Sequence, residues 1–193
     1  QLYTNATIRP SAKLLAQLAG FQEVHLYLSI DGCGPVNEYL RPPSKWSDIQ
    51  EVVRHWLDWQ AQHSHVVSSL AHTLSLVNLL SFAELLAWRK TLQPQPELVL
   101  QMVHWPRALS LAALSLELKK VLAERLNEKI LSVGTLDAPA LRALETIRTL
   151  LQTPTLKSLH KSEFYSEIER LDRVRGENFR QTFVELNALL EQN

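Results

Sequence analysis

In the first hundred residues, short continuous runs of apolar residues are separated by stretches with helical periodicity. The clearest run covers residues 24–30 and is broken only by His25 and Ser29, a pattern typical of a strand buried on both faces of a parallel sheet. Three weaker runs predict further strands at residues 2–5, 66–75 and 98–103. The pattern therefore predicts four strands.

Between these runs, apolar residues recur every three or four positions, which predicts helices over residues 11–19, 47–62 and 79–90. Ser11 is a suitable N-cap, and Gly20 favours a left-handed C-cap after the first helix. Ser47 and Gln50 have the spacing of a capping box. Residues 31–45 are expected to form a long irregular loop. Strands that alternate with helices predict parallel pairing through right-handed crossovers.

From residue 114 onward, leucine stripes at helical spacing replace the strand patterns. Ser115 and Asp137 are suitable N-caps for two long helices. Two further helices, over residues 164–174 and 179–190, are expected to be separated at Gly176. We therefore predict an α/β region followed by an all-helical extension. The predicted boundaries are residues 1–113 and 114–193.

Four short parallel strands cannot close a barrel, and an open edge would expose unpaired backbone N–H and C=O groups. The chain also starts at Gln1 rather than at a methionine, directly before a predicted strand end. Both observations lead to the expectation that preceding strands belong to a longer polypeptide.

Composition narrows the range of partners and compartments. The chain has 193 residues, with 20 basic and 20 acidic side chains and a formal net charge of zero, which disfavours binding to nucleic acid or to an anionic membrane. No stretch approaches the length of a membrane span, and the chain opens without a signal-peptide pattern. Cys33 is the single cysteine, which favours a reducing compartment, and we expect a cytoplasmic protein.

The end of the central strand carries the most informative chemistry. Asp31-Gly32 follows the strand directly and Gly34-Pro35 lies just behind, which forces the backbone out of the strand. Ser29 and Asp31 are two positions apart, so both can point to the same face. In α/β folds, ligands bind at the carboxyl ends of parallel strands, which makes both residues candidates for a binding site.

At this point several short segments resemble a known family. Thr4-Asn5-Ala6-Thr7 and Ser29-Ile30-Asp31-Gly32 resemble the ends of the fourth and fifth core strands of radical S-adenosylmethionine enzymes. The runs Val36-Asn-Glu-Tyr-Leu-Arg41 and Pro43-Ser-Lys-Trp46 resemble the branch called twitch or SPASM-type enzymes. The resemblance continues at Leu76-Val-Asn78 and at Leu171-Asp-Arg-Val-Arg-Gly-Glu-Asn-Phe179, and so extends over nearly the whole chain.

The resemblance implies a partial parallel (β/α) barrel in which a [4Fe-4S] cluster reduces S-adenosylmethionine. The resulting 5′-deoxyadenosyl radical abstracts hydrogen from a substrate, often a peptide or a small metabolite. By position, Thr4, Asn5, Ser29 and Asp31 would line the S-adenosylmethionine side of the barrel.

The chain also departs from this family. The family's Cys-x3-Cys-x2-Cys cluster motif and its Gly-Gly-Glu-Pro segment are absent, and Ala6 replaces a usual glycine. In the family these missing elements precede the part seen here. We therefore expect the carboxyl-terminal portion of such an enzyme, whose main partner is the missing amino-terminal half. Alone, this chain is expected to hold no cluster and to be inactive.

Simpler structural roles compete with each candidate site. Asp31 could bind a cofactor or merely cap the following turn, and the same choice applies to Ser29. Cys33 could be reactive in its loop, although free cysteines are more often inert and buried. His63 and His65 have a spacing that can bind metal on a strand, although a solvated helix end is the simpler interpretation. His72 is expected to be a hydrogen-bonded core histidine.

The remaining aromatic and charged candidates have structural interpretations too. Trp56, Trp59 and Trp88 are expected to pack in the core. Arg41 and Lys45 flank Pro42-Pro43 and could meet an anionic group or remain solvated. Arg173 and Arg175, near Glu177, could form an ion pair between tail and barrel.

A rival function stays open. The chain could be a non-catalytic α/β-helical module that binds a partner peptide along its open strand edge. The neutral charge and the missing cysteines motivate this rival hypothesis.

Overall fold

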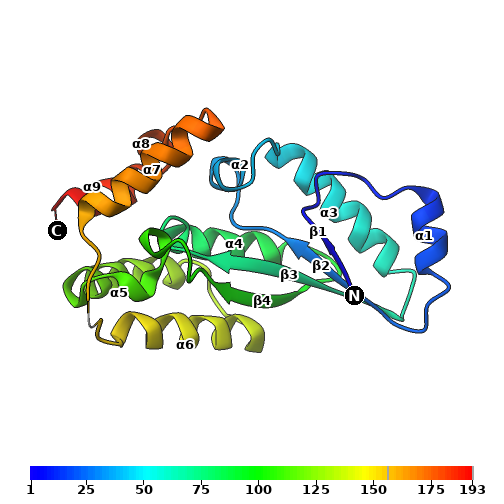
Figure 1. Ribbon diagram of the computed structural model, residues 1–193. Helices are drawn as coiled ribbons and strands as arrows, with labels where there is room; N and C mark the ends of the chain where they lie inside the picture. The colour runs from blue at the N-terminus through cyan, green and yellow to red at the C-terminus, as the bar shows by residue number, and fades with distance from the viewer. Residues whose placement is uncertain (156, 193) are drawn as a thin grey trace.

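Four parallel strands form the centre of the computed structural model, which describes residues 1–155 and 157–192. The strands follow one another across the sheet in chain order, as Figure 1 shows. They are β1 (Leu2–Thr4), β2 (Val24–Ser29), β3 (Val66–Leu74) and β4 (Glu97–Met102). Each neighbouring pair is parallel, so the four predicted strands and their parallel pairing are confirmed.

Helices connect consecutive strands and continue after the last one. The connections contain α1 (Ala12–Leu18), α2 (Pro35–Leu40), α3 (Trp46–Gln60), the 3₁₀ turn η1 (Leu79–Ser81) and α4 (Phe82–Lys90). After β4 come two 3₁₀ turns, η2 (Arg107–Leu109) and η3 (Leu111–Ala113). These are followed by α5 (Leu116–Leu131), α6 (Ala138–Gln152), α7 (Lys161–Arg175), α8 (Phe179–Thr182) and α9 (Val184–Gln192). The protein is therefore a mixed α/β structure.

The strand register defines two different faces of the sheet. Leu28 lies beside Thr4 on β1 and Leu70 on β3, so these side chains point to one side, which we call the covered face. The covered face carries the aliphatic residues Leu26, Leu28, Ile30, Leu70 and Leu74, all buried at 0–1% exposure. The alternate residues Tyr3, Tyr27, Ser29 and Asp31 point to the opposite side, which we call the open face.

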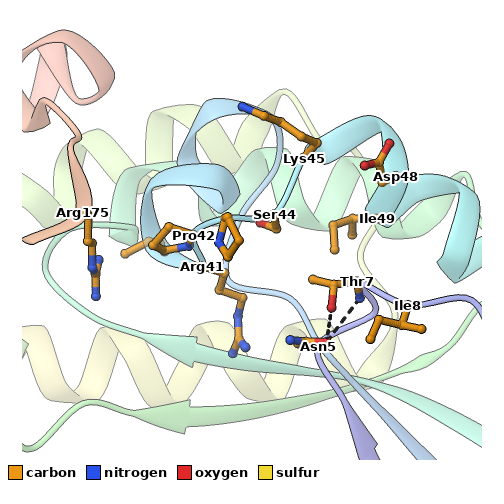
Figure 2. Close-up of a pocket in the computed structure, with 12 residues that line it drawn as sticks. Asn5, Thr7, Ile8, Arg41, Pro42, Ser44, Lys45, Asp48, Ile49 and Arg175 are labelled. Atoms are coloured by element: carbon orange, nitrogen blue, oxygen red, sulfur yellow. Dashed lines mark hydrogen bonds between the residues drawn. The ribbon is translucent and has the colours of Figure 1, made fainter.

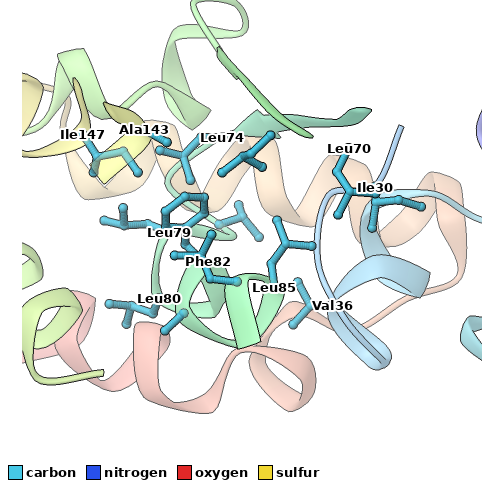
Figure 3. Close-up of a cluster of buried hydrophobic side chains, with 14 of the residues drawn as sticks. Ile30, Val36, Leu70, Leu74, Leu79, Leu80, Phe82, Leu85, Ala143 and Ile147 are labelled. Atoms are coloured by element: carbon cyan, nitrogen blue, oxygen red, sulfur yellow. The ribbon is translucent and has the colours of Figure 1, made fainter. Parts of the chain in front are cut away.

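The core lies between the covered face and the helices. Figure 3 shows Ile30, Leu70 and Leu74 of the sheet beside Phe82 and Leu85 of α4, together with Ala143 and Ile147 of α6. The helix α3 adds the stripe predicted from its sequence, which is Ile49, Val52, Val53, Trp56 and Leu57. Burial of this apolar surface is the main driving force for folding.

The predicted irregular loop over residues 31–45 is wrong, because α2 forms within it. Pro35 stands at the first helical position, where its missing N–H costs nothing. The predicted N-cap at Ser47 is also wrong. α3 begins at Trp46, whose backbone N–H donates to Glu38 Oε1 of α2 at 2.8 Å. A side chain from the preceding helix therefore satisfies the start of α3.

Two other predicted helix ends differ from the structure. The left-handed glycines are Gly34, Gly134 and Gly176, so α1 ends at Leu18 without a left-handed Gly20. The predicted helix over residues 179–190 is interrupted at Phe183, which separates α8 from α9. The predicted caps Ser11, Ser115 and Asp137 are confirmed, since each side chain accepts a backbone N–H.

The helices after β4 are tied to the sheet region by buried polar contacts. The helix α6 packs against β4. Arg89 of α4 is buried and donates to Asp137 Oδ2, at the start of α6, at 2.8 Å. Lys119 of α5 donates to the backbone oxygen of Thr153 at 2.8 Å, which satisfies the end of α6. Among the described residues, no helix has both the length and the apolar character needed to cross a membrane.

Candidate functional site

Asp31 is the centre of a polar network at the carboxyl end of β2. Its Oδ1 accepts the backbone N–H of Thr73 at the end of β3, at 2.8 Å. Its Oδ2 lies 2.8 Å from Arg41 Nε in an ion pair, and the Asp31 side chain is only 13% exposed. Asp31 therefore joins two strand ends and the segment after α2, instead of simply capping its own turn.

Two asparagines hold the backbone around Asp31. Asn78 Nδ2 donates to the backbone oxygens of Asp31 at 2.8 Å and Thr73 at 3.0 Å. Asn37 Oδ1 accepts the N–H of Asp31 at 3.1 Å. Both asparagines are buried, and neither was predicted as a site residue. Both asparagines could have been found from the sequence, because each follows a predicted strand end, where an asparagine amide can replace backbone hydrogen bonds.

The other three predicted cofactor residues are placed differently. Ser29 is half-buried on the open face, as its alternation with Leu28 predicts. Thr4 lies beside Leu28 on the covered face, and its Oγ1 accepts the N–H of Ala6 at 3.1 Å. Asn5 is exposed, and its Oδ1 accepts both the N–H and the hydroxyl of Thr7.

Ala6 sits in an unfavourable backbone conformation immediately after these residues. Its φ is +55°, in the left-handed region that glycine adopts most easily, and its side chain is fully buried. A non-glycine residue there costs about 1–2 kcal/mol. The turn geometry that a glycine would favour is therefore kept although an alanine occupies the position.

A cavity of about 630 Å³ opens beside this network, and Figure 2 shows its lining. It is lined by Asn5, Thr7, Ile8, Leu40, Arg41, Pro42, Pro43, Ser44, Lys45, Asp48, Ile49 and Arg175. Of the four predicted cofactor residues, Asn5 reaches this lining, whereas Thr4, Ser29 and Asp31 are not among the described residues that line it. The volume is typical of a small-molecule site.

The cavity also joins the loop after α2 to the tail. Arg175, at the end of α7, donates from Nη1 to the backbone oxygen of Tyr39 at 3.1 Å, and its guanidinium lies 5.9 Å from the Tyr39 ring. Among the described residues, no ion pair links Arg173 or Arg175 to Glu177. The tail contact predicted for Arg175 thus exists, but through a backbone oxygen.

Tyr39 and Asp172 form the second part of this tail contact. The Tyr39 hydroxyl donates to Asp172 Oδ1 at 2.8 Å, and both carboxylate oxygens of Asp172 also accept the N–H of Phe179. Burial, followed by the hydrogen bond to Asp172, raises the pKa of Tyr39. The Tyr39 ring also packs edge-on against Phe183, with the ring centres 5.0 Å apart. These contacts fix the end of α7 beside the cavity.

Cys33 and His72 fit their simpler interpretations, whereas His63 and His65 are half-buried instead of solvated, and His63 packs on the Trp59 ring. Burial raises the pKa of the Cys33 thiol to about 12, with a smaller contribution from Glu84, so the reactive thiolate is scarce. His72 is buried, and its Nδ1 lies 3.0 Å from the backbone oxygen of Ile30. His63 Nδ1 lies 2.7 Å from the backbone oxygen of Trp59, at the end of α3.

Two of the three tryptophans predicted to pack are core residues, and the third, Trp88, is partly buried against the core. Trp56 and Trp59 are buried, and Trp88 packs edge-on against Trp46 with ring centres 4.9 Å apart.

The donor set of this chain does not fit an iron–sulfur cluster. A [4Fe-4S] cluster of this type needs three cysteine thiolates, whereas the chain has one cysteine, held as a protonated thiol. Within residues 1–155 and 157–192, no group of three or more His, Cys, Asp or Glu side chains could hold a metal ion. A cluster would require residues from outside this chain.

The chain was compared with known protein families, curated proteins and solved structures. No protein-family model matches the chain, and no curated protein or solved structure matches it either.

Proposed function

We propose that this chain is the carboxyl-terminal part of a radical S-adenosylmethionine enzyme of the twitch or SPASM type. Residues 1–113 would complete a partial (β/α) barrel, and residues 114–193 would form a helical extension. The whole protein would use the cofactor radical to abstract hydrogen from a substrate. This chain alone would be inactive.

One observation carries the proposal: the segments that resemble the family converge in space. Asp31 of the second segment contacts Asn37 and Arg41 of the third and Asn78 of the fifth. Tyr39 contacts Asp172 of the last segment. Strand ends meet at one edge in any parallel sheet, so the support lies in the side-chain contacts, through which Asp31 holds Arg41 and the Thr73 N–H at this edge.

In the complete enzyme, bound S-adenosylmethionine would supply the radical, with its cluster held by the preceding part of the polypeptide. The residues of this chain would position the bound molecules. Ser29 and Asp31 would face them from the open face, and Asn5 would reach them from the turn after β1. Arg41 and the Thr73 N–H would hold the Asp31 carboxylate in one orientation. Thr4 would act on the backbone of this turn through Ala6.

The test is anaerobic reconstitution of the polypeptide together with its preceding segment, followed by an assay for 5′-deoxyadenosine. We expect iron–sulfur absorbance and cofactor cleavage, and we expect neither from residues 1–193 alone. Asp31→Asn should lower cleavage about tenfold or more, because a charge-assisted contact is lost. Asp58→Asn, on the exposed side of α3, is the matched control. Absence of a cluster in the longer polypeptide would contradict the proposal.

A second candidate function follows from the edge of the sheet. In the described part of the chain, β1 pairs with β2 on one side, which leaves its other edge available to an added strand. A non-catalytic module that binds a peptide there would fold alone. Binding of a strand-forming peptide by residues 1–193, seen as protection of the β1 amides from hydrogen exchange, would favour this module, and absence of such protection would favour the incomplete enzyme.

We also propose that the protein works in the cytoplasm. The support is the free thiol of Cys33, which forms no disulfide. Cell fractionation followed by detection of the protein would test this location, and recovery outside the cytosolic fraction would contradict it.

A further inference from the structure

The cavity beside Asp31 has the chemistry of an anion-binding site. We propose that it binds the phosphate or carboxylate group of a small-molecule substrate, with Arg41, Lys45 and Arg175 as its cationic ligands. This assignment rests on the proposed function only in naming the bound molecule as substrate. Binding of the anion itself follows from the cavity.

The charged side chains that line the cavity are the first argument for anion binding. Three cationic side chains line the cavity, against one carboxylate, that of Asp48. The carboxylates of Asp31 and Glu38 pair with Arg41 and Lys45 and offset part of this charge, so the lining offers an anion the N–H donors that these ion pairs leave unused. Arginine suits phosphate and carboxylate because its planar guanidinium can donate two parallel hydrogen bonds.

The partners of these cations leave donors available. Arg41 faces Asp31 through Nε alone. Lys45 Nζ is 3.5 Å from Glu38, and its side chain is largely exposed. Arg175 donates to a backbone oxygen, and none of the ion pairs among the described residues includes it. Arg175 is thus the cation with the most to gain from a bound anion.

A buried hydroxyl provides an independent observation. Ser44 lines the cavity and is only 6% exposed, yet its Oγ has no hydrogen-bond partner within the described residues. A buried polar group without a partner costs about 1–3 kcal/mol. A ligand oxygen in the cavity would remove this cost, because Ser44 can donate to it. Figure 2 shows Ser44 between the arginines and Lys45, on the lining itself.

The size of the cavity limits the occupant to a small molecule. A volume of about 630 Å³ is within the range of sites that enclose metabolite-sized ligands. The mixed lining supports this choice, since Ile8, Leu40 and Ile49 offer apolar contact next to the charged groups. The bound molecule would therefore combine an anionic group with a less polar body.

The experiment is calorimetric titration of residues 1–193 with inorganic phosphate and, separately, succinate, at constant ionic strength. We expect saturable binding to one site. Arg175→Gln should weaken binding about tenfold, because it removes a charged donor. Arg142→Gln is the matched control, since Arg142 is an exposed arginine on α6 outside the cavity, and it should bind like the parent protein.

Several outcomes would overturn the assignment. These are no saturable binding by the parent protein, equal binding by Arg175→Gln, or equal weakening in the Arg142→Gln control. Circular dichroism checks that the variants are folded. If Arg175→Gln does not fold, Lys45→Gln gives the same test from an exposed side chain, with the same expected direction.

A competition experiment separates this inference from the proposed function. If S-adenosylmethionine displaces phosphate from the parent chain, the cavity holds the cofactor and the substrate assignment is wrong. If phosphate binds without such competition while the longer polypeptide fails to cleave S-adenosylmethionine, the anion site stands and the proposed function fails.

Discussion

The two faces of the sheet differ in what they bury. The covered face carries aliphatic side chains at 0–1% exposure, packed against helices. The open face carries Tyr3 and Val67, which are 58% and 37% exposed, and it ends in Ser29 and Asp31. Because side chains alternate along a strand, the same strand contributes aliphatic residues that stabilise the covered face and polar residues near the strand end of the open face.

The prediction that β2 is buried on both faces is wrong, because His25, Tyr27 and Ser29 on the open face are only half-buried. Both sets of side chains come from the same seven-residue run, which looks uniformly apolar apart from His25 and Ser29. The exceptions in that run point to the open face. Substitutions on the two faces should accordingly have different consequences.

The largest expected effect comes from the covered face. Leu28→Ala should lower the free energy of unfolding by about 2–5 kcal/mol, because it removes buried methyl groups and leaves a cavity. Val67→Ala on the open face should cost less than about 1 kcal/mol. Urea denaturation measures both. Equal costs would show that the two faces do not differ as described.

The next effect concerns the contact between α2 and the tail. Tyr39→Phe keeps the ring but loses the hydrogen bond to the Asp172 carboxylate, and it should cost about 1.5–3 kcal/mol. Tyr165→Phe is the matched control, because its hydroxyl donates to the neutral amide oxygen of Asn187 at 3.0 Å. Its cost should be about 0.5–1.5 kcal/mol, measured by the same denaturation. The reverse order would contradict a special role for Asp172.

The third effect is a pH dependence from His72 on the covered face. Burial lowers the pKa of His72, although Asp31 and the contact with Ile30 act in the opposite direction. As the pH falls, His72 is therefore protonated in the unfolded chain before it is protonated in the folded chain. The contribution of His72 is complete above its ordinary pKa of about 6.5 and is lost as pH falls toward the folded pKa.

The measurement is urea denaturation between pH 5 and pH 8. Below about pH 6.5, loss of this contribution should reach at most about 1.4 kcal/mol per pH unit. His72→Asn keeps a donor near the Ile30 oxygen and should reduce the slope, whereas His104→Asn, at an exposed site, is the control. An unchanged slope in His72→Asn would exclude His72 as its source.

The smallest effect should come from the stacked tyrosines of the open face. Tyr3 and Tyr27 stack on the open face with ring centres 4.5 Å apart and planes 9° apart. Tyr3→Ala should cost about 0.5–1 kcal/mol, because stacking between neighbouring strands is lost while little buried area changes. Tyr3→Phe keeps the stack and should be nearly neutral in the same assay. A cost near that of Leu28→Ala would show that this face is part of the core.

Hydrophobic patterning was sufficient to predict the strands, because β2 is a near-continuous apolar run and the other three are weaker apolar runs that alternate with helical patterns. It was also sufficient for the caps Ser11, Ser115 and Asp137, which act within one helical turn. It failed for α2, which is short and surrounded by glycine and proline. The start of α3 was also missed, because its cap is Glu38 from another helix.

The position of the candidate site could be predicted from the sequence, but the side-chain contacts within it could not. Alternation indicated the shared face of Ser29 and Asp31 at a strand end. The contacts of Asp31 with Arg41 and Asn78 depend on tertiary structure, so local sequence could not reveal them. Thr4 was assigned by motif position alone, and the register places it beside Leu28 on the covered face.

The tail contribution to the cavity has a consequence for biosynthesis. Arg175 lies 136 positions after Tyr39, its hydrogen-bond partner. A ribosome that adds about 5–20 residues per second needs on the order of ten seconds to cover that distance. During this interval the nascent sheet can form with two of the three cations in place. Truncated translation products that end before α7 would therefore keep the strands and lack the guanidinium that reaches the cavity from the tail.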